Sequence, residues 1–350
     1  MRLRKTAKWL ALTLSLVVLI SVGYYGFTLY NSLDGLHKNG AISSIFDGKK
    51  TDNLGYQEPV STYVPPEWTG KDRVNILLLG GDSRGKTNGE IPRSDSIMIA
   101  SIDPVTKKAA LFSILRDTYV KIPDHGMDRI NAALAYGGPN LAVETVSEFT
   151  GLQIQYYVYT DFQGFMSLVD AIGGIDIDVE KDMDYVDAWD GHEFDIHLKK
   201  GFQHLDGKTA LQYVRFRHDA TSDFTRTERQ RKFMTAVAQK MQSTTNLLKL
   251  PKIVSAMDPY IETNLSVNDM LRLGTLGYKI MAGTVASQQL PPNNLVQDLR
   301  VGGAQVVGTD ADAVKAFITD FLEQQLATPE PSSDTSGSPS PSPSGTSPGA

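Results

Sequence analysis

Three short apolar runs in the middle of the chain constrain the fold more than any other feature. They are Val74–Leu79, Ser96–Ile102 and Ala109–Leu115. A strand that is apolar on both faces must be covered on both faces by other elements. The runs therefore predict central strands of a sheet that lies between two covering layers.

Further patterns along the chain predict the elements of those layers. Two more strands are expected at Tyr156–Thr160 and Ile175–Val179. Apolar residues recur with helical spacing in five segments, Asn140–Thr150, Phe162–Ala171, Arg226–Gln242, Val267–Ile280 and Asp310–Leu326. Strands that alternate with helices are typical of a layered α/β domain. We therefore expect one globular α/β domain over residues 73–327.

The N-terminal segment predicts a membrane anchor. From Trp9 to Tyr30 no side chain is charged, and a helix of that length spans roughly 33 Å, enough to cross a hydrocarbon core. Residues 1–8 carry four basic and no acidic side chains, which favours a cytoplasmic N-terminus and an extracytoplasmic remainder. A cleaved signal peptide is the alternative, but the run is long and no small-residue cleavage site follows it closely.

Two segments of different composition flank the predicted domain. Residues 31–72 hold Gly, Asn, Asp and Pro without clear periodicity and are expected to form an extracytoplasmic stalk. Residues 328–350 are almost entirely Pro, Ser, Gly and Thr. Such a segment buries too little apolar surface to offset its conformational entropy, so we expect a disordered tail.

Composition excludes several classes of function. The 350 residues contain no cysteine, which excludes a disulfide framework, a zinc–thiolate site and a cysteine nucleophile. The net charge of -6 gives no support to a nucleic-acid partner. No zinc-binding HExxH pattern occurs in the sequence.

Charged residues gather where the predicted strands begin or end. These residues are Asp82, Arg84, Arg93, Asp95, Arg116 and Asp117. Neighbouring strand ends of one sheet can bring such side chains together. A single Arg–Asp pair would be an ordinary surface salt bridge, but three strand ends of the same composition favour a functional site.

A second charged cluster follows later in the chain. Arg215 and Arg217 point to one face if their stretch is extended. On a helix that begins near Phe224, one face carries Arg226, Arg229 and Gln230. Asp223 is in place to cap this helix. A solvated helix face is the ordinary interpretation, but arginines this close repel one another unless an anion lies among them.

The residue types indicate phosphate chemistry. Arginine is suited to bidentate recognition of phosphate. Asp82 and Asp95 would be poor partners for a bare phosphate, but they fit a Mg²⁺ ion between them and the phosphate oxygens. Arginines with a carboxylate-held Mg²⁺ stabilise charge in phosphoryl transfer. The residues alone therefore predict an extracytoplasmic site for a phosphate or pyrophosphate.

The same residues resemble the motifs of a known family. In chain order they are Gly80-Gly81-Asp82-Ser83-Arg84, Arg93-Ser94-Asp95-Ser96, Arg116-Asp117, Ile130-Asn131-Ala132-Ala133, Asp161-Phe162, Tyr213-Val214-Arg215-Phe216-Arg217 and Asp223-Phe224-Thr225-Arg226. As an ordered set over about residues 73–235, they are similar to the LytR-CpsA-Psr family. The chain departs from the family pattern at Leu115, Asp206 and Lys208. None of these is among the charged residues of the motifs quoted above.

The resemblance implies a fold and a reaction. The fold would be a three-layer α/β/α sandwich with a central mixed sheet, preceded by one transmembrane helix. The protein would be a phosphotransferase of a Gram-positive-type envelope. It would move a glycopolymer, such as teichoic acid or capsule, from an undecaprenyl-pyrophosphate carrier in the membrane to peptidoglycan. The lipid tail would occupy an apolar tunnel between the sheet and the helices Phe162–Ala171 and Arg226–Gln242.

The resemblance also implies residue roles. Asp82 and Asp95 match ligands of Mg²⁺ or Mn²⁺. The implied pyrophosphate contacts are Arg84, Arg93, Arg116, Asn131, Arg215, Arg217, Arg226 and Gln230. The implied catalytic residues are Arg116, Arg215, Arg217 and Asp223. The general base stays open between Asp117 and Asp223.

Three other functions compete with a transferase. A lipid-pyrophosphate hydrolase would use the same residues, with water in place of the sugar. A regulator that binds polyprenyl phosphates without turnover would need the arginines but not the carboxylates. A structural wall protein would leave the arginine cluster unexplained. The presence of both residue types favours the enzyme.

Overall fold

The computed structural model describes residues 19–35, 61–82, 92–186, 192–219, 223–280 and 285–327. A six-stranded sheet with strand order β11-β6-β1-β2-β3-β12 lies at its centre. The strands are β1 Val74–Gly81, β2 Ser94–Ile102, β3 Ala109–Ile114, β6 Tyr156–Thr160, β11 Ile261–Thr263 and β12 Ala286–Leu290. Since β1 pairs parallel with β6 but antiparallel with β2, the sheet is mixed, as predicted.

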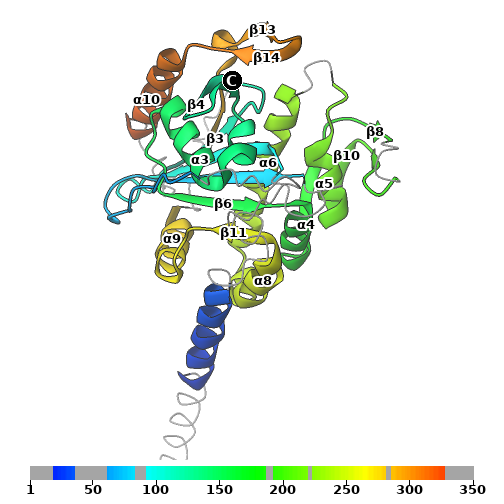
Figure 1. Cartoon of the computed structure of the whole chain (residues 1–350). Helices are drawn as coiled ribbons and strands as arrows, with labels where there is room; N and C mark the ends of the chain where they lie inside the picture. The colour runs from blue at the N-terminus through cyan, green and yellow to red at the C-terminus, as the bar shows by residue number, and fades with distance from the viewer. Residues whose placement is uncertain are drawn as a thin grey trace, which may run out of the picture.

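Helices cover both faces of the sheet (Figure 1). Side chains alternate along each strand. Those that point to one face, such as Leu77 and Phe112, pack against α3 (Ala132–Thr150) and α10 (Ala311–Ala327). The opposite face is covered by α4 (Phe162–Ala171), α6 (Asp223–Met241), α8 (Leu250–Met257) and α9 (Val267–Ile280). The predicted layers on both sides of the sheet are therefore present.

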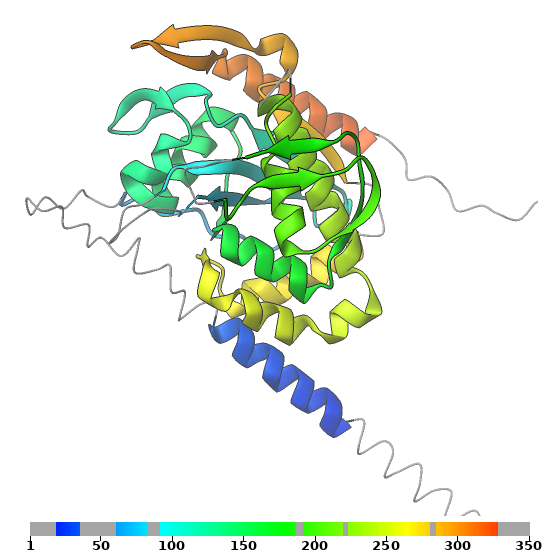
Figure 2. The same cartoon turned by 90° about the vertical axis from the view of Figure 1, so that its right-hand side faces the viewer.

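A second, smaller core lies beside the sheet (Figure 2). It is built by four short strands and one helix, β7 Ile175–Val179, β8 Met183–Tyr185, β9 Ile196–Leu198, β10 Gly201–Leu205 and α5 Gly207–Arg215. The alternating sequence of β7 buries Ile175, Ile177 and Val179 and exposes the two aspartates between them. These residues pack against α4 and α6, so the smaller core fixes α5 beside the N-terminal half of α6.

The remaining elements are short. Two hairpins lie on the α3 side, β4–β5 (Tyr119–Ile122, Gly126–Arg129) and β13–β14 (Gln297–Val301, Ala304–Gly308). Between α6 and α9 lie α7 (Thr244–Leu248) and a 3-10 turn at Asp258–Tyr260. Another such turn is Asn293–Leu295.

The structure extends some of the predicted elements. The helix expected at Asn140 begins at Ala132, because Gly137 and Gly138 leave helical geometry before Pro139 and join two helical stretches across a kink. Gly138 has a positive φ of 71°, which favours glycine. The sequence pattern did not predict the hairpins or α5, because each is too short to show a clear period.

Residues 19–35 form a helix whose C-terminal turns pack on the domain. Leu33 is buried with Val254 of α8 and Ile261 of β11. Among the residues that the structure describes, no helix is both long and apolar enough to cross a membrane. Residues 9–18 of the predicted anchor lie outside the described residues, as do residues 1–8 and the predicted tail 328–350, so these remain predictions.

The predicted stalk is only partly described. Residues 31–35 continue the N-terminal helix, and residues 36–60 lie outside the described part of the chain. Trp68 is buried against Val74 and Tyr156, and its Nε1 donates a hydrogen bond of 2.8 Å to the carbonyl of Asp72. The last residues of this segment therefore pack against the domain.

Candidate active site

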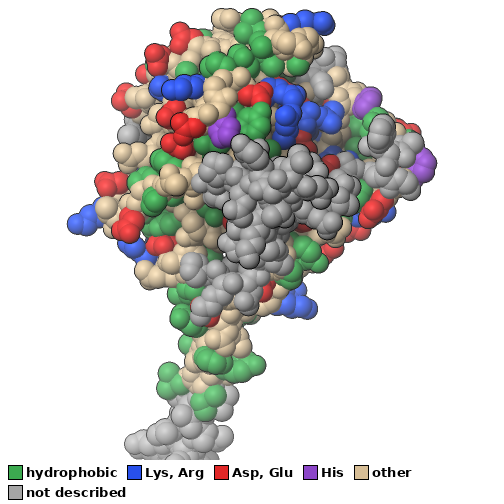
Figure 3. Space-filling view, viewed as in Figure 1, with side chains coloured by type: hydrophobic (Ala, Val, Ile, Leu, Met, Phe, Trp, Pro, Cys, Tyr) green, Lys and Arg blue, Asp and Glu red, His purple; other side chains and the backbone are tan. Residues whose placement is uncertain are grey.

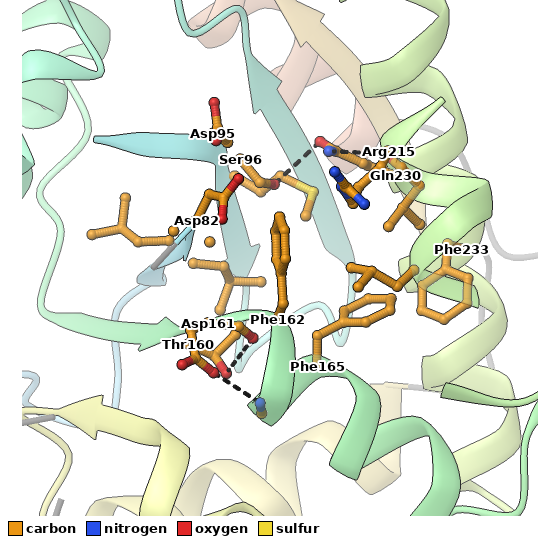
Figure 4. A pocket seen from close by; sticks show the side chains of 18 of the residues that line it. Asp82, Asp95, Ser96, Thr160, Asp161, Phe162, Phe165, Arg215, Gln230 and Phe233 are labelled. Atoms are coloured by element: carbon orange, nitrogen blue, oxygen red, sulfur yellow. Dashed lines mark hydrogen bonds between the residues drawn. The ribbon is translucent and has the colours of Figure 1, made fainter. Parts of the chain in front are cut away.

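A cavity of about 310 Å³ lies between the sheet and the helices α4, α6 and α8. Its interior is apolar and is lined by Leu78, Met98, Val158, Phe165, Leu168, Phe233, Met234, Met257 and Ile261. Its mouth is polar and is lined by Asp82, Asp95, Arg215, Arg217, His218, Arg226 and Gln230. Figure 4 shows Asp82 and Asp95 at one side of the cavity and Phe165 and Phe233 at another. The pocket is thus amphipathic, as a tunnel lined by α4 and α6 would require.

The two predicted metal-binding carboxylates are placed by the ends of β1 and β2. The strand register shifts between Gly80, which pairs with Ser96, and Gly81, which pairs with Ser94. Asp95 therefore lies in a β-bulge, a feature that redirects a side chain. A Cβ at Gly81 would collide with the Tyr159 hydroxyl, so glycine is required where β1 approaches this phenol.

Negative charge is concentrated around this bulge. Tyr159 is buried beneath it, and burial together with the charges of nearby carboxylates raises the pKa of its hydroxyl. These carboxylates include Asp161, Asp82 and Asp95. Asp161 caps α4 by accepting a hydrogen bond of 2.9 Å from the amide of Gly164, and it also lines the pocket. The sequence motif Asp161-Phe162 by itself indicates no role for Asp161 at the pocket.

Arg116 follows β3 and connects three acidic side chains. It is hydrogen-bonded to Asp95, and its Nε lies 3.5 Å from Asp117 and 3.8 Å from Asp223. Burial alone would lower the pKa of Arg116, but the charges of Asp95, Asp223 and Asp117 outweigh burial and raise it. The structure thus unites the two charged clusters of the sequence, because Asp223 belongs to the second and Arg116 to the first.

Arg226 and Gln230 reach the pocket from the first turns of α6. The Arg226 side chain is only 5% exposed and donates a hydrogen bond of 2.9 Å to Asp223. Burial lowers the pKa of Arg226 to about 10, and the positive charges of Arg116 and Arg217 act in the same direction. Gln230 accepts a hydrogen bond of 3.1 Å from the Ser96 hydroxyl. An anion at the mouth would offset the mutual repulsion of these arginines.

Arg215 and Arg217 come from the end of α5. Arg215 is the last residue of this helix, and its guanidinium lies over the rings of Phe162 and Phe194, at 4.9 and 5.4 Å from their centroids. Arg217 is exposed at the mouth of the pocket. His218 stacks on Tyr185 of β8 at a centroid distance of 4.1 Å. Figure 3, viewed as in Figure 1, shows Lys and Arg side chains gathered on the upper part of the molecule.

The other predicted contacts lie elsewhere or are not described. Arg84 lies outside the described residues. Arg93 is exposed and does not line the pocket. Asn131 is buried behind the site, where its backbone N–H donates to the backbone carbonyl of Arg116 (3.2 Å) and its backbone carbonyl accepts from the backbone N–H of Ser94 (3.4 Å). Their roles at the pyrophosphate remain predictions.

Arg229 faces away from the pocket, although it follows the same helical spacing as Arg226. Its side chain is 3% exposed and forms ion pairs with Glu180 and Asp219. It also donates a hydrogen bond of 2.8 Å to the carbonyl of Phe216. These contacts tie the segment that carries Arg217 to α6, so Arg229 is a positioning residue.

The carboxylates fit a divalent cation only together with a substrate. No group of three or more ligating side chains in the described ranges could hold a metal. Asp82 and Asp95 nevertheless line one pocket, and Mg²⁺ is commonly bound by one or two carboxylates plus phosphate oxygens and water. The donor set therefore suits a metal that arrives with a phosphorylated ligand.

Known proteins are similar to this chain in sequence. A model of the LytR_cpsA_psr family matches residues 41–321. The regulatory protein MsrR of Staphylococcus aureus is 34% identical over 258 residues, which cover 72% of this chain and 75% of MsrR. The polyisoprenyl-teichoic acid–peptidoglycan teichoic acid transferase TagU of Bacillus mycoides is 35% identical over 260 residues, which cover 73% of this chain and 77% of TagU.

A solved structure shares the fold. It is that of the LytR-CPS2A-psr family protein YwtF (TagT) with bound octaprenyl pyrophosphate lipid. It is similar to this chain with a TM-score of 0.56 and 27% sequence identity. The match covers 76% of this chain and 97% of the YwtF chain.

Proposed function

The chain belongs to the LytR-CpsA-Psr family, and from that premise we propose that it transfers a glycopolymer from a polyprenyl-pyrophosphate carrier to peptidoglycan. One observation carries the proposal: a single pocket joins an arginine- and carboxylate-lined mouth to an apolar interior. A ligand that fills both parts has an anionic head and a hydrocarbon tail. The octaprenyl pyrophosphate bound in YwtF has this chemistry, and the name of TagU states a teichoic acid transfer to peptidoglycan.

The two parts of the pocket would hold the two parts of the donor. The isoprenoid tail would pack between Met98, Phe165 and Phe233, where burial of apolar surface favours binding by about 25 cal/mol per Å². The pyrophosphate would lie among Arg116, Arg217 and Arg226. Charge-assisted hydrogen bonds from guanidinium groups to phosphate oxygens are stronger than neutral ones.

The reaction exchanges one phosphorus–oxygen bond for another. The acceptor hydroxyl forms a new bond to the phosphorus next to the glycan, and the bond from that phosphorus to the polyprenyl phosphate breaks. The arginines neutralise the charge on the transferring group and on the leaving phosphate. Bound at Asp82 and Asp95, Mg²⁺ or Mn²⁺ would supply further positive charge to the phosphate oxygens.

The hydroxyl proton requires an acceptor near the mouth. Asp117 and Asp223 are the candidates, since both face Arg116 and both are partly exposed. Arg129 also pairs with Asp117 at 3.2 Å, whereas Asp223 pairs with Arg226 at 2.9 Å. The two candidates therefore share Arg116 but differ in their second arginine partner, and comparison of D117N with D223N would distinguish them.

The proposal includes a membrane location. The uncharged run Trp9–Tyr30 and the basic residues before it support a single-pass anchor with the domain outside the cytoplasm. A lipid-linked donor is also a membrane component, so an anchored enzyme would share its environment.

A polyprenyl-pyrophosphate hydrolase or a regulator is the second candidate. The relative MsrR is described as a regulatory protein, which is the observation in favour of a regulator. A regulator would bind the lipid-linked polymer without altering it. A hydrolase would release the polymer from the lipid equally well with or without peptidoglycan.

The test uses the full chain in vesicles with a labelled lipid-linked polymer. We expect the labelled polymer to leave the lipid only when peptidoglycan is present as the acceptor, and the label to become attached to that peptidoglycan. R217A should lower the rate of transfer roughly 100-fold or more, because a charge-stabilising donor is lost. R300A is the matched control, since Arg300 is an exposed arginine of β13 away from the pocket. Transfer by R217A at the wild-type rate would refute the site.

A further inference from the structure

Exposed apolar side chains gather at the end of the domain that carries helix 19–35. Leu271 and Tyr278 are seven residues apart on α9 and therefore share a face. This face lies opposite to Leu273 and Leu276, which pack toward the sheet. Leu248 of α7 is 73% exposed. Single exposed apolar residues are common, so their place in the fold decides what they mean.

The N-terminal helix packs against α8 and α9, at the same end of the domain. Leu29 and Leu33 of that helix pack against one cluster with Leu250 of α8 and Met270 of α9. Further from the domain, the helix exposes a series of large apolar side chains, Leu19, Ile20, Val22, Tyr24 and Phe27. Figure 2 shows the helix, in blue, projecting from the end formed by α8 and α9, in yellow. The exposed residues of α7 and α9 therefore belong to the helical segments at the end of the domain from which this apolar helix projects.

Basic side chains accompany this apolar surface. Lys249 and Lys252 of the α7–α8 segment and Lys279 of α9 are exposed, although the net charge of the chain is -6. Lysines next to apolar and aromatic side chains are typical of surfaces that lie in the headgroup layer of a membrane. Each lysine close to an anionic leaflet favours binding by about 1 kcal/mol.

The apolar interior of the pocket reaches the same end of the domain. Met257 of α8 and Ile261 of β11 line the pocket and also pack against the cluster that contains Leu33. An isoprenoid tail that left the pocket between these residues would emerge beside helix 19–35. It would meet the hydrocarbon of a bilayer there without crossing water.

We propose that this face, defined by Leu248, Lys249, Lys252, Leu271, Tyr278 and Lys279, rests on an anionic lipid bilayer with the apolar end of the pocket directed toward the lipid. The proposal rests on the proposed function in one respect, the membrane anchor. It adds an orientation, because a domain tethered only by an anchor could turn any of its faces toward the membrane.

The absence of cysteine makes the test direct. A single introduced cysteine is the only thiol in the 350 residues. L271C places a fluorescent label on the proposed face, and L299C places it on β13, at the opposite end of the molecule in Figure 1. Leu271 and Leu299 are 42% and 41% exposed, so the two labels start from matched accessibility.

The measurement is quenching by a nitroxide at the lipid headgroup. The full-length chain is placed in vesicles of phosphatidylglycerol and phosphatidylcholine, and flotation with the vesicles confirms attachment. We expect quenching at L271C to exceed that at L299C several-fold. The double change K249E/K252E in the L271C protein should remove most of this difference. Equal quenching at the two positions overturns the proposal, and an unchanged difference in the double variant overturns the role of anionic lipid.

Other outcomes distinguish this inference from the proposed function. Shielding of the L271C label from the nitroxide, together with disulfide cross-linking of the unlabelled L271C protein into a dimer, would assign the face to a second copy of the chain and overturn the proposal. No donor or acceptor is present in the assay. A chain that shows the expected quenching but transfers no polymer therefore refutes the function alone. A chain that transfers polymer but shows equal quenching refutes the orientation alone.

Discussion

The arginines of the pocket differ in how their charge is balanced. Arg116 lies among Asp95, Asp117 and Asp223, which raise its pKa despite burial. Arg226 is more deeply buried and has a lowered pKa of about 10. A shift of this size corresponds to a cost on the order of 3 kcal/mol for keeping the charge in the folded state. A bound pyrophosphate would offset that cost, so the buried charge of Arg226 favours ligand binding.

This balance predicts opposite effects of R226M on stability and on binding. Without the desolvated charge, the thermal midpoint of the ligand-free protein should rise by roughly 2–4 °C, which is what about 1 kcal/mol produces in a domain of this size. Binding of a polyprenyl pyrophosphate should weaken by roughly 10- to 100-fold, because a charge-assisted hydrogen bond is lost. Thermal unfolding and ligand titration measure the two effects.

R226K is the control for this prediction, since lysine keeps the charge without the planar donor set. It should recover part of the binding but none of the added stability. The interpretation is wrong if R226M binds the lipid as well as the wild type does and unfolds at a lower temperature.

The helix α6 organises the site at the scale of elements. One side carries Arg226, Gln230 and Phe233 into the pocket. Another side is fixed to the sheet, where the Thr227 hydroxyl donates a hydrogen bond of 3.2 Å to Gln289 of β12. A third side presents Arg229 to the smaller core. The helix therefore connects both cores to the site, and a change on one side can act on another.

R229M should weaken the attachment of the smaller core to α6. Removal of the guanidinium leaves Asp219 with Lys181 as its remaining ion-pair partner, so the cost should lie at or below the low end of the roughly 3–5 kcal/mol for a buried charge left unpaired. We expect a lower midpoint in urea denaturation and a lower kcat for transfer, because the segment that holds Arg217 loosens. R300M, an exposed arginine on β13, should change neither.

The pH dependence of this effect has a definite sign. Burial would raise the pKa of Asp219, but hydrogen bonds from Lys181, Arg229 and Thr225 outweigh burial and lower it below 3.8. A carboxyl with a lowered pKa in the folded state contributes stability above its unfolded value, and that stability is lost as the pH falls through the folded value. The difference in stability between wild type and R229M should therefore shrink below pH 3.8. A difference that grew on acidification would contradict the assignment.

At the scale of the whole molecule, the pocket matters because it joins two environments. Its mouth lies where the ends of β1, β2 and β3 meet α6. Its interior extends along the face of the sheet covered by α4 and α6 to Met257 of α8, which also packs on the cluster that contains Leu33 of helix 19–35. Neither end alone selects a lipid-linked diphosphate, but a ligand that fills both ends gains binding free energy from both.

Ligands that fill one or both parts of the pocket should therefore stabilise the protein to different extents. Octaprenyl pyrophosphate at 100 times its Kd should raise the unfolding free energy by about 2.7 kcal/mol, or the thermal midpoint by roughly 5–10 °C. Inorganic pyrophosphate and octaprenol, each at the same concentration, should produce much smaller shifts. An equal shift with inorganic pyrophosphate would show that the apolar interior does not take part in binding.

The sequence by itself determined the layered α/β fold and the residue types of the site. Fully apolar runs can be stable only inside a covered sheet, so Val74–Leu79 and its neighbours predicted the central strands. Asp82, Asp95 and Arg116 were identified because they follow or precede these strands. The family resemblance then predicted the lipid ligand from an ordered set of motifs.

Only the tertiary structure decided which of these side chains meet. Helical spacing put Arg226, Arg229 and Gln230 on one face. In the structure Arg229 pairs with Asp219, and only the other two line the pocket. Periodicity defines a face about 100° wide, and the elements packed against each edge decide which side chain points where. Asp161 became part of the site for the same reason. A capping residue is recognisable in sequence, but its distance from Asp82 depends on how β6 and β1 pair across the sheet.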